Sequence, residues 1–312
     1  MARSSIVSGL SGVLNEYLKL RRSLGFALER EGRQLPQFVA FLEAHDSVII
    51  TASLALRWAL LSPSGSRSQS ASRLGMVRGF AKYLAALDAR TEVPCHELLP
   101  LPSSRKLIPY IYTDADICAL MRTTQILNGL KQMTYATLIG LLATTGMRVG
   151  EAIALDHQDV NVAAGMLVVR HGKFGKSREL PLHATTSAAL SAYARDRDLA
   201  LRYPRSPSFL LSLAGTRLNY KNVHFSFLRL LRASGVDARH CRPRIHDLRH
   251  TFAVNTLLRW YREGVAVDAR LPSLSTYLGH VSPASTYWYL TATPELLQCA
   301  SQRVERLVGS AS

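Results

Sequence analysis

Two tyrosine hydroxyls and an imidazole lie close together near the end of the chain, at Tyr287, Tyr289 and His280 in the segment GHVSPASTYWYLTAT. A phenol becomes a nucleophile when a neighbouring base takes its proton. The other interpretation is that these rings and Trp288 are packing residues, because aromatic side chains usually supply core contacts. The rest of the chain has to decide between the two.

Two further stretches carry cations suited to anion chemistry. In TTGMRVGEAIAL a glycine ends one helix and Arg148 begins the next, which puts a guanidinium beside free backbone N–H groups. Glu151 is spaced to hold this arginine or to complete the helix cap. In RHGKFGKSRELPL a glycine-rich turn carries Lys173 and Lys176. A lysine at such a tip can protonate a leaving alkoxide, or it can serve only as a polar turn residue.

A third stretch, RPRIHDLRHTFAVNTLL, predicts a helix with His246, Arg249 and His250 at positions i, i+3 and i+4. These spacings put two imidazoles and a guanidinium on one face of the helix. Such a cluster is energetically unfavourable unless it binds a ligand. Arg242 and Arg244 add further cations to the approach.

In chain order these stretches supply Arg, Lys, His-x-x-Arg, His and Tyr, a set that resembles the tyrosine recombinases of the phage integrase family, which includes the Xer and Cre types. The resemblance covers residues 110–300, and RLGMVRGFAKYL extends it more loosely to the helical core-binding domain of that family. The catalytic positions that it implies are Arg148, Lys173, His246, Arg249, His280 and Tyr289.

The resemblance also implies a role for each group. Arg148 and Arg249 would clamp the non-bridging oxygens of a DNA phosphate, and His280 would support that clamp by a hydrogen bond. Tyr289 would attack the phosphorus while His246 helps to accept its proton. In the same scheme the hairpin lysine acts as the general acid for the departing 5′ oxygen.

The implied function is that of a site-specific DNA recombinase or integrase working through a 3′-phosphotyrosine intermediate. The two guanidiniums would neutralise the transition-state charge, so we expect no metal, and the link conserves the bond energy, so we expect no ATP or other cofactor. The sequence agrees, since it lacks a GxxxxGK[ST] motif and a clear carboxylate cluster. YWYLTATPELL favours recombinases of mobile elements, hence DNA integration and transposition. Two alternatives stay open: a type IB topoisomerase-like strand-passage enzyme, and a non-catalytic DNA-binding accessory protein of related recombinases.

The overall charge agrees with a nucleic-acid partner. The 312 residues carry a formal net charge of +16, and only seven of the 38 basic residues are lysine. Arginine forks match phosphate oxygens, and cations spread along a whole chain favour a large polyanionic surface such as double-stranded DNA over a single pocket.

The expected fold is mainly α with a small antiparallel sheet, in two domains. A helical core-binding domain spans residues 1–92, a proline-rich linker 93–110, and a catalytic domain 111–312 with a C-terminal tail helix. MLVVRH and RELPL predict the strands of one hairpin, and Thr51 and Thr113 are predicted to cap the helices that follow them. The Ser-rich stretch SPSGSRSQSAS predicts a turn before the fourth N-terminal helix.

That fourth helix, SRLGMVRGFAKYLAAL, alternates cations with apolar residues, so it can bury one face and present the other to DNA; a merely solvated basic face is the alternative. The predicted DNA contacts outside the catalytic set are Arg73, Arg78, Lys82, Lys176, Arg242 and Arg244.

The C-terminal segment TPELLQCASQRVERLVGSAS predicts an amphipathic helix capped by Thr293, with Pro294 in its first turn. The resemblance implies a homo-tetramer on DNA that exchanges this helix, or a hetero-assembly with related recombinases. Packing of the same apolar stripe within the chain is an equal alternative.

The four cysteines are widely spaced and lack zinc-site pairing, so we expect reduced thiols and no metal site. The N-terminus lacks the pattern of a secretory signal, and the longest apolar run, TLIGLLATTGM, is too short to span a bilayer. A cytoplasmic, nucleoid-associated protein without a membrane partner is expected.

Overall fold

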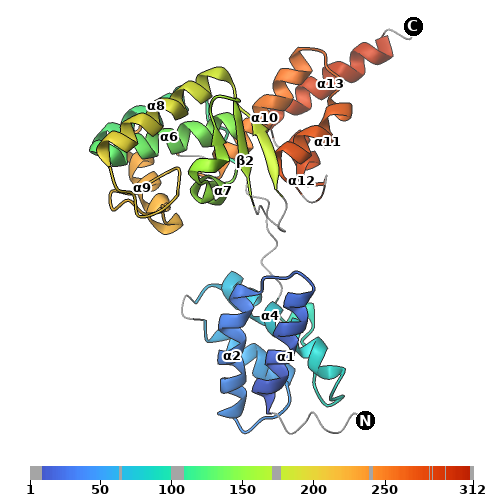
Figure 1. The fold of residues 1–312 in the computed structure, drawn as a ribbon. Coiled ribbons are helices and arrows are strands. Elements are labelled where there is room, and N and C mark those ends of the chain that lie inside the picture. The colour runs from blue at the N-terminus through green and yellow to red at the C-terminus, as the bar shows by residue number, and fades with distance from the viewer. Residues whose placement is uncertain are drawn as a thin grey trace. The chain divides into compact units, whose positions relative to one another are not determined.

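The computed structural model describes residues 9–62, 65–99, 109–170, 177–238, 242–280, 282, 284–291 and 293–309. The chain forms two compact units, Met1–Leu107 and Ile108–Ser312 (Figure 1). The predicted linker over 93–110 falls partly on residues outside the described ranges. Each unit has its own hydrophobic core and is described by itself.

The described part of the N-terminal unit contains four helices, α1 (Leu10–Ser23), α2 (Glu29–Glu43), α3 (Ala52–Leu60) and α4 (Arg67–Ala85), followed by a short 3-10 turn (His96–Leu98). Thr51 caps α3 as predicted, since its hydroxyl accepts from the Leu54 backbone N–H at 3.3 Å. The Ser-rich turn was predicted too long: α4 already begins at Arg67. Ser70 and Ala71 are buried in the first turns of α4, so packing draws this polar stretch into the helix.

The second unit holds the remaining helices. They are α5 (Asp114–Thr123), α6 (Gly129–Thr145), α7 (Val149–Ala154), α8 (Ala184–Ala200), α9 (Tyr220–Ala233), α10 (Asp247–Arg262), α11 (Val267–Leu278), α12 (Ala284–Tyr287) and α13 (Pro294–Gly309), with 3-10 turns at Thr124–Ile126, His157–Asp159 and Trp288–Thr291. Thr113 and Asp116 form a capping box at the start of α5.

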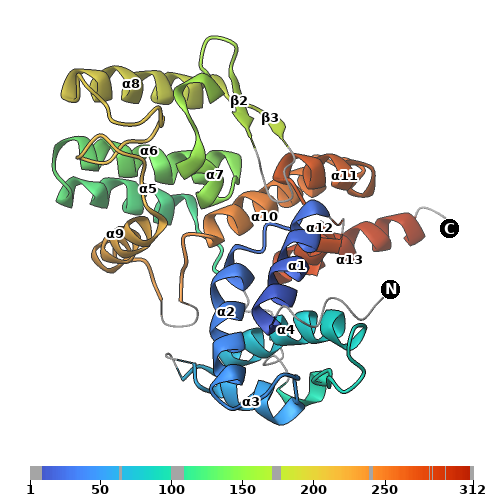
Figure 2. The same ribbon diagram turned by 60° about the horizontal axis from the view of Figure 1, so that its bottom comes forward.

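A three-stranded antiparallel sheet lies at one side of this unit, in the order β1 (Val160–Asn161), β2 (Met166–Val169) and β3 (Arg178–Pro181) (Figure 2). The predicted hairpin of β2 and β3 is confirmed, with Leu167 opposite Leu180. The two-residue β1 was not predicted, because so short a strand shows no alternation. The predicted fold class, mainly α with a small antiparallel sheet, is confirmed.

Two clusters of apolar side chains organise the second unit. The larger one collects residues from α6, the sheet, α8 and α9, among them Leu138 and Leu167. The other joins α10, α11 and the start of α13, and it includes Leu257, Leu296 and Tyr289. The turn that carries Tyr289 is therefore anchored in a core of its own.

Candidate active site

Arg148 stands at the N-terminus of α7 and is fixed there by Glu151. Its backbone N–H donates to Oε2 of Glu151 at 2.9 Å, and its Nη1 donates to Oε1 at 2.8 Å. The side chain is only partly buried, so the rest of the guanidinium stays accessible. Glu151 therefore fulfils both alternatives that the sequence left open, because it holds this arginine and completes the helix cap.

Glu151 also binds a second arginine, Arg178 of β3, whose Nη2 donates to Oε2 at 2.8 Å. Burial by itself raises the pKa of the Glu151 carboxyl, but the hydrogen bonds from Arg178 and Arg148 outweigh it and hold that pKa at about 2. The carboxylate is therefore ionised at neutral pH and keeps both guanidiniums in place.

The two predicted clamp arginines meet at the turn that follows α11. Gly279 adopts a left-handed backbone, with φ 67°, and ends this helix. Nη2 of Arg148 donates to the Gly279 carbonyl at 3.0 Å, and Nη2 of Arg249 donates to the neighbouring Leu278 carbonyl at 2.7 Å. Consecutive carbonyls thus place two guanidiniums from α7 and α10 side by side.

Arg249 is the more deeply placed of the pair, at 2% exposure. Its Nη1 donates to the Gly146 carbonyl at 2.9 Å, at the left-handed end of α6. Burial and the charge of Arg148 lower the pKa of Arg249 to about 10, so the group keeps its proton at neutral pH. A buried cation of this kind is well suited to an anionic ligand.

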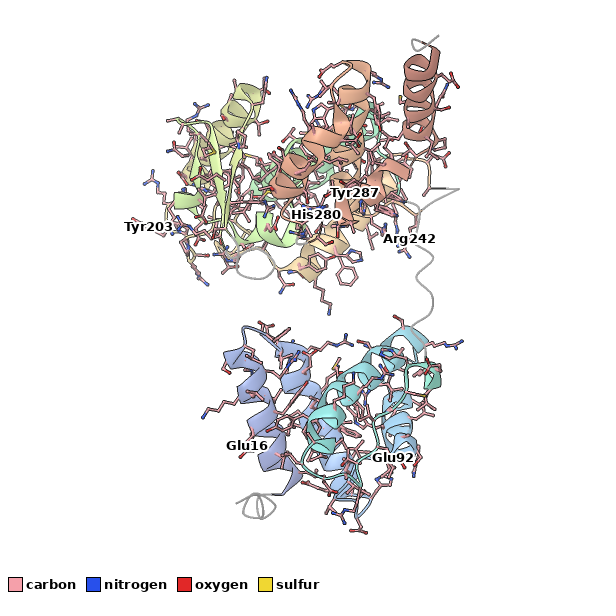
Figure 3. All side chains as sticks on the ribbon, turned by 90° about the vertical axis from the view of Figure 1, so that its right-hand side faces the viewer. Glu16, Glu92, Tyr203, Arg242, His280 and Tyr287 are labelled. Carbon is pink, nitrogen blue, oxygen red and sulfur yellow. The ribbon has the colours of Figure 1, made fainter. Side chains whose placement is uncertain are left out.

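Tyr289 and Tyr287 differ sharply in environment. Tyr289 is 2% exposed, whereas Tyr287 is 50% exposed (Figure 3, where Tyr287 and His280 are labelled). The helix α12 ends at Tyr287, and Tyr289 lies in the following 3-10 turn. Burial raises the pKa of the Tyr289 hydroxyl, and the positive charge of the Arg249 guanidinium lowers it in part.

Three histidines surround the Tyr289 ring or its neighbours. Nδ1 of His250 lies 3.1 Å from the Tyr289 hydroxyl. The His280 ring is stacked on Tyr289 at 6.1 Å, and its Nδ1 lies 2.7 Å from the Thr286 hydroxyl. The His246 ring meets the His250 ring edge-on at 4.9 Å.

Burial, reinforced by the charged groups around them, lowers the pKa of all three histidines and favours their neutral form. Burial, then the charges of Arg249 and Arg148, lower the pKa of His280 to about 4. Burial and the neighbouring His246 lower the pKa of His250 to about 4 as well. At neutral pH both imidazoles can therefore act as hydrogen-bond acceptors as well as donors.

Lys173 and Lys176 lie outside the described residues, so their predicted roles stay predictions. The strands on either side of their loop are described, and Nε of Arg178 on β3 donates to the Tyr277 carbonyl at 2.7 Å. The hairpin base is thus tied directly to the end of α11, one turn before His280.

The predicted DNA contacts of the N-terminal unit are placed very differently. Arg73 is buried, lies 3.7 Å from the Trp58 ring centroid and donates to the Trp58 carbonyl, so we remove it from the candidate DNA contacts. Arg78 is half-buried and donates to the carbonyls of Pro94 and Cys95. Lys82 is exposed. The spacing of apolar residues along α4 does not indicate that Arg73 stacks on Trp58 of α3.

In the second unit, Arg242 is exposed (Figure 3). Arg244 pairs with the buried Asp247 at 2.7 Å, which orients the start of α10. Both stay candidates for DNA contact. Arg244 has this structural role in addition.

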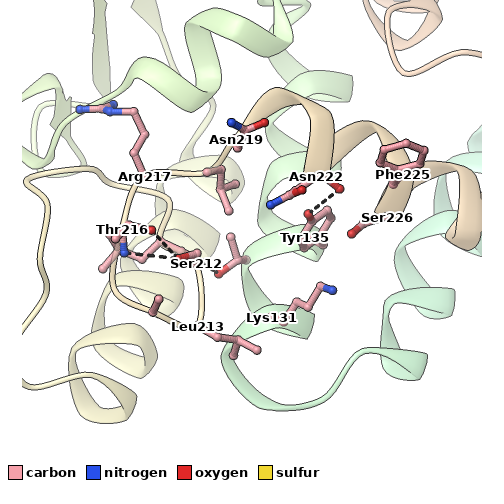
Figure 4. A pocket seen from close by; sticks show the side chains of 14 residues that line it. Lys131, Tyr135, Ser212, Leu213, Thr216, Arg217, Asn219, Asn222, Phe225 and Ser226 are labelled. Carbon is pink, nitrogen blue, oxygen red and sulfur yellow. Dashed lines mark hydrogen bonds between the residues drawn. The ribbon is translucent and has the colours of Figure 1, made fainter.

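A cavity of about 520 Å³ lies between α6, α9 and the 212–216 turn (Figure 4). Lys131, Tyr135 and Arg217 line it, but its described lining includes none of the predicted catalytic residues. Within the described part of the chain, no group of three or more His, Cys, Asp or Glu side chains is arranged to hold a metal ion. The described helices also include none that is long and apolar enough to cross a membrane.

Two residues of the site were given no role by sequence reasoning. His250 was noticed as part of the cationic helix face but was not assigned a function. Arg178 gave no signal, because its partners Glu151 and Tyr277 are 27 and 99 positions away.

A model of the phage integrase family matches residues 112–295. The chain is 44% identical over 306 residues to the integrase/recombinase y4rB of Sinorhizobium fredii, covering 94% of this chain and 96% of that protein. It is 32% identical over 290 residues to the tyrosine recombinase XerC of Pelobacter propionicus, covering 88% and 87%. The Tn1549 transposon integrase, solved with transposon right end DNA, shares the fold at 18% identity and a TM-score of 0.61, covering 94% and 99%.

Proposed function

The chain belongs to the phage integrase family of tyrosine recombinases, and from this premise we propose that Tyr289 cleaves DNA by forming a 3′-phosphotyrosine link. The protein is a recombinase of the integrase type, acting in site-specific recombination. In the proposed reaction the link is resolved by a 5′-hydroxyl of another strand. Because each exchange conserves the phosphodiester bond energy, ATP is not consumed.

The observation that carries this proposal is the pairing of Arg148 and Arg249 on the consecutive carbonyls of Gly279 and Leu278, beside the buried Tyr289. A guanidinium has five N–H donors, and the carbonyl bonds use only part of each set. We propose that remaining donors of both groups bind the non-bridging oxygens of one phosphate. Preorganised cations of this kind stabilise the charge that develops in a phosphoryl-transfer transition state.

The other predicted residues complete the reaction. His280 lies against the Tyr289 ring and would hydrogen-bond the phosphate. Lys173 would protonate the departing 5′ oxygen. His246 shares the cationic helix face with Arg249 and supports proton transfer from the nucleophile. We propose double-stranded recombination sites as the substrate and a tetramer as the active assembly, with the protein bound to the nucleoid in the cytoplasm.

A suicide substrate tests the nucleophile. A nicked duplex made from the ends of the element that carries this protein traps the covalent intermediate, because the short cleaved strand diffuses away. We expect a protein–DNA adduct with the wild type and with Tyr287→Phe, and none with Tyr289→Phe. An adduct with Tyr289→Phe, or its loss with Tyr287→Phe, contradicts the assignment.

The clamp is tested by substitutions that keep the charge and remove the fork. Arg148→Lys and Arg249→Lys should slow adduct formation by roughly 100-fold or more while DNA affinity changes little. Equal losses in binding and cleavage would contradict a mainly catalytic role.

Two product assays separate the alternative activities. Relaxation of a supercoiled plasmid without exchange between two sites would favour the topoisomerase alternative. DNA binding without any adduct on native ends would favour the accessory-protein alternative.

A further inference from the structure

We propose that His250 is a catalytic residue that binds the Tyr289 hydroxyl and receives its proton as the phenol attacks. This inference rests on the proposed function of Tyr289. It reassigns the proton acceptor from His246, where the family resemblance put it, to the histidine four residues later on α10.

His250 directly contacts the hydroxyl oxygen of Tyr289, the atom that would attack the phosphate. Nδ1 of His250 is 3.1 Å from the Tyr289 hydroxyl oxygen, which is hydrogen-bonding distance. His246 meets the ring of His250 instead, edge-on at 4.9 Å. Of these two imidazoles, His250 is the one with a direct hydrogen bond to the nucleophile.

Two neighbouring aromatic rings hold the His250 ring in this position. The ring packs edge-on against Trp288 at 5.4 Å on one side and against His246 on another. Consecutive residues of an α-helix point about 100° apart. Arg249 therefore reaches the carbonyls of the clamp while His250 reaches the nucleophile, so one turn of α10 supplies both groups.

The direction of the hydrogen bond between His250 and Tyr289 follows from which groups can donate and which can accept. The positive charge of Arg249 lowers the pKa of the Tyr289 hydroxyl, and a guanidinium has no acceptor that could take the phenol proton. The phenol has a single proton, and the side chain is 2% exposed, which leaves little access for water. The geometry assigns that proton to Nδ1 of His250, which requires the imidazole to carry its own hydrogen on Nε2.

The resulting step is balanced. The Tyr289 O–H bond breaks and its proton moves to Nδ1, while the freed oxygen electron pair forms the bond to phosphorus. The P–O5′ bond breaks on the opposite side, and the leaving oxygen takes a proton from a different group, proposed as Lys173. On resealing, the imidazolium of His250 returns its proton to the phenolate leaving group.

The charges around His250 couple this transfer to DNA. In the free protein, burial, His246, Arg244 and Arg249 lower the pKa of His250 to about 4, with Asp247 acting in the opposite direction. A DNA phosphate in the clamp adds negative charge close by, which raises the pKa of the imidazole. His250 is therefore a weak base until substrate is bound, which protects the free protein from adventitious ionisation of its nucleophile.

The test compares His250→Asn and His250→Ala with the wild type on the suicide substrate, at equal DNA occupancy. The asparagine oxygen can lie near the position of Nδ1 and accept the hydrogen bond, but it does not take up a proton. We expect both variants to slow single-turnover cleavage by about 100-fold. His224→Asn, an exposed histidine on α9, is the control and should cleave as the wild type does.

A modified substrate separates the two proton transfers. When the bridging 5′ oxygen is replaced by sulfur, the leaving group needs no acid, so Lys173→Ala should regain its rate and His250→Asn should not. Wild-type cleavage by His250→Asn would overturn the proposal, and so would its rescue by the sulfur substrate. If His250→Ala is unfolded by thermal melting, His250→Asn alone decides.

The two proposals fail in different ways. If the wild type forms no Tyr289-dependent adduct, the proposed function is wrong. If the wild type forms that adduct and His250→Asn matches its rate, only the role of His250 is wrong.

Discussion

At the scale of single residues, the site is a cluster of cations organised by one carboxylate. Glu151 binds Arg148 and Arg178, while Arg249 has backbone carbonyls as its partners. The single negative charge of Glu151 offsets only part of the positive charge of these three guanidiniums, and the surplus positive charge favours a phosphate. Removing the carboxylate would leave buried cations without compensation, which is costly.

We therefore predict a specific acid sensitivity from Glu151. Its pKa is about 2 in the folded chain, below the ordinary glutamate value of 4.5, so the folded state binds this proton more weakly. The resulting stabilisation is complete above about pH 4.5 and is lost as the pH falls towards 2. We expect Glu151→Gln to lower the free energy of unfolding at pH 7 by about 3 kcal/mol and to lose that difference in acid.

Denaturant titrations between pH 2 and pH 7 measure this effect. Glu179→Gln is the matched control, because Glu179 is an exposed glutamate on β3. A Glu151→Gln variant that is as stable as the wild type at pH 7 would show that the carboxylate does not hold the arginines.

At the scale of elements, the site depends on how two helices end. α6 ends at Gly146 and α11 ends at Gly279, both with left-handed backbone. At each end the carbonyl of the final turn or of the glycine itself accepts from a clamp arginine. The helix ends thus set the positions of Arg148 and Arg249.

Gly146→Ala tests this dependence. An added Cβ would lie 2.8 Å from Cγ of Phe252, and φ of 61° is unfavourable for alanine. We expect the free energy of unfolding to fall by about 2 to 4 kcal/mol and cleavage to slow, because the Arg249 anchor moves. Gly150→Ala, on the exposed side of α7 with open space around it, should change neither measurement. Equal stability of both variants would refute the argument.

The tail helix α13 offers a second comparison between neighbours. Leu296 is fully buried in the α10–α11 cluster, whereas Leu297 is 52% exposed. The first turn of α13 therefore packs against its own chain. For this turn, the alternative of packing within the chain is the one that the structure shows. Helix exchange between protomers remains a proposal for the rest of the helix.

We predict that Leu296→Ala lowers stability by about 2 to 4 kcal/mol, because it leaves a cavity. Leu297→Ala should leave melting unchanged and weaken assembly on DNA, which native gels and light scattering measure. Unchanged assembly by Leu297→Ala would remove this residue from the protomer interface.

At the scale of the whole molecule, two independently cored units share an excess of 16 positive charges. Such an excess attracts DNA along its backbone, and the affinity should fall steeply with salt as counterions are released. The position of each cation decides whether it contributes. Lys82 is exposed, whereas Arg73 is buried against Trp58.

We predict that Lys82→Ala reduces the slope of log K against log salt by about 0.9, in binding titrations from 50 to 300 mM salt. Arg73→Ala should keep the slope and lower the stability of the N-terminal unit by about 1 to 3 kcal/mol, since it loses the stacked guanidinium. The opposite pattern would return Arg73 to the DNA contacts.

The sequence by itself determined the fold class, the helix caps at Thr51 and Thr113, the β2–β3 hairpin and the identity of the family. Each of these depends on local spacing or on the order of residue types along the chain. Hydrophobic periodicity and helix capping involve residues only a few positions apart, so both can be read from the sequence alone.

Only the tertiary structure decided which of these side chains touch. The contact of His250 with Tyr289 spans 39 positions, that of Arg178 with Tyr277 spans 99, and that of Arg249 with Gly146 spans 103. The stacking of Arg73 on Trp58 likewise arises between two helices. Such contacts depend on how helices pack and where they end, and no local pattern in the sequence encodes that.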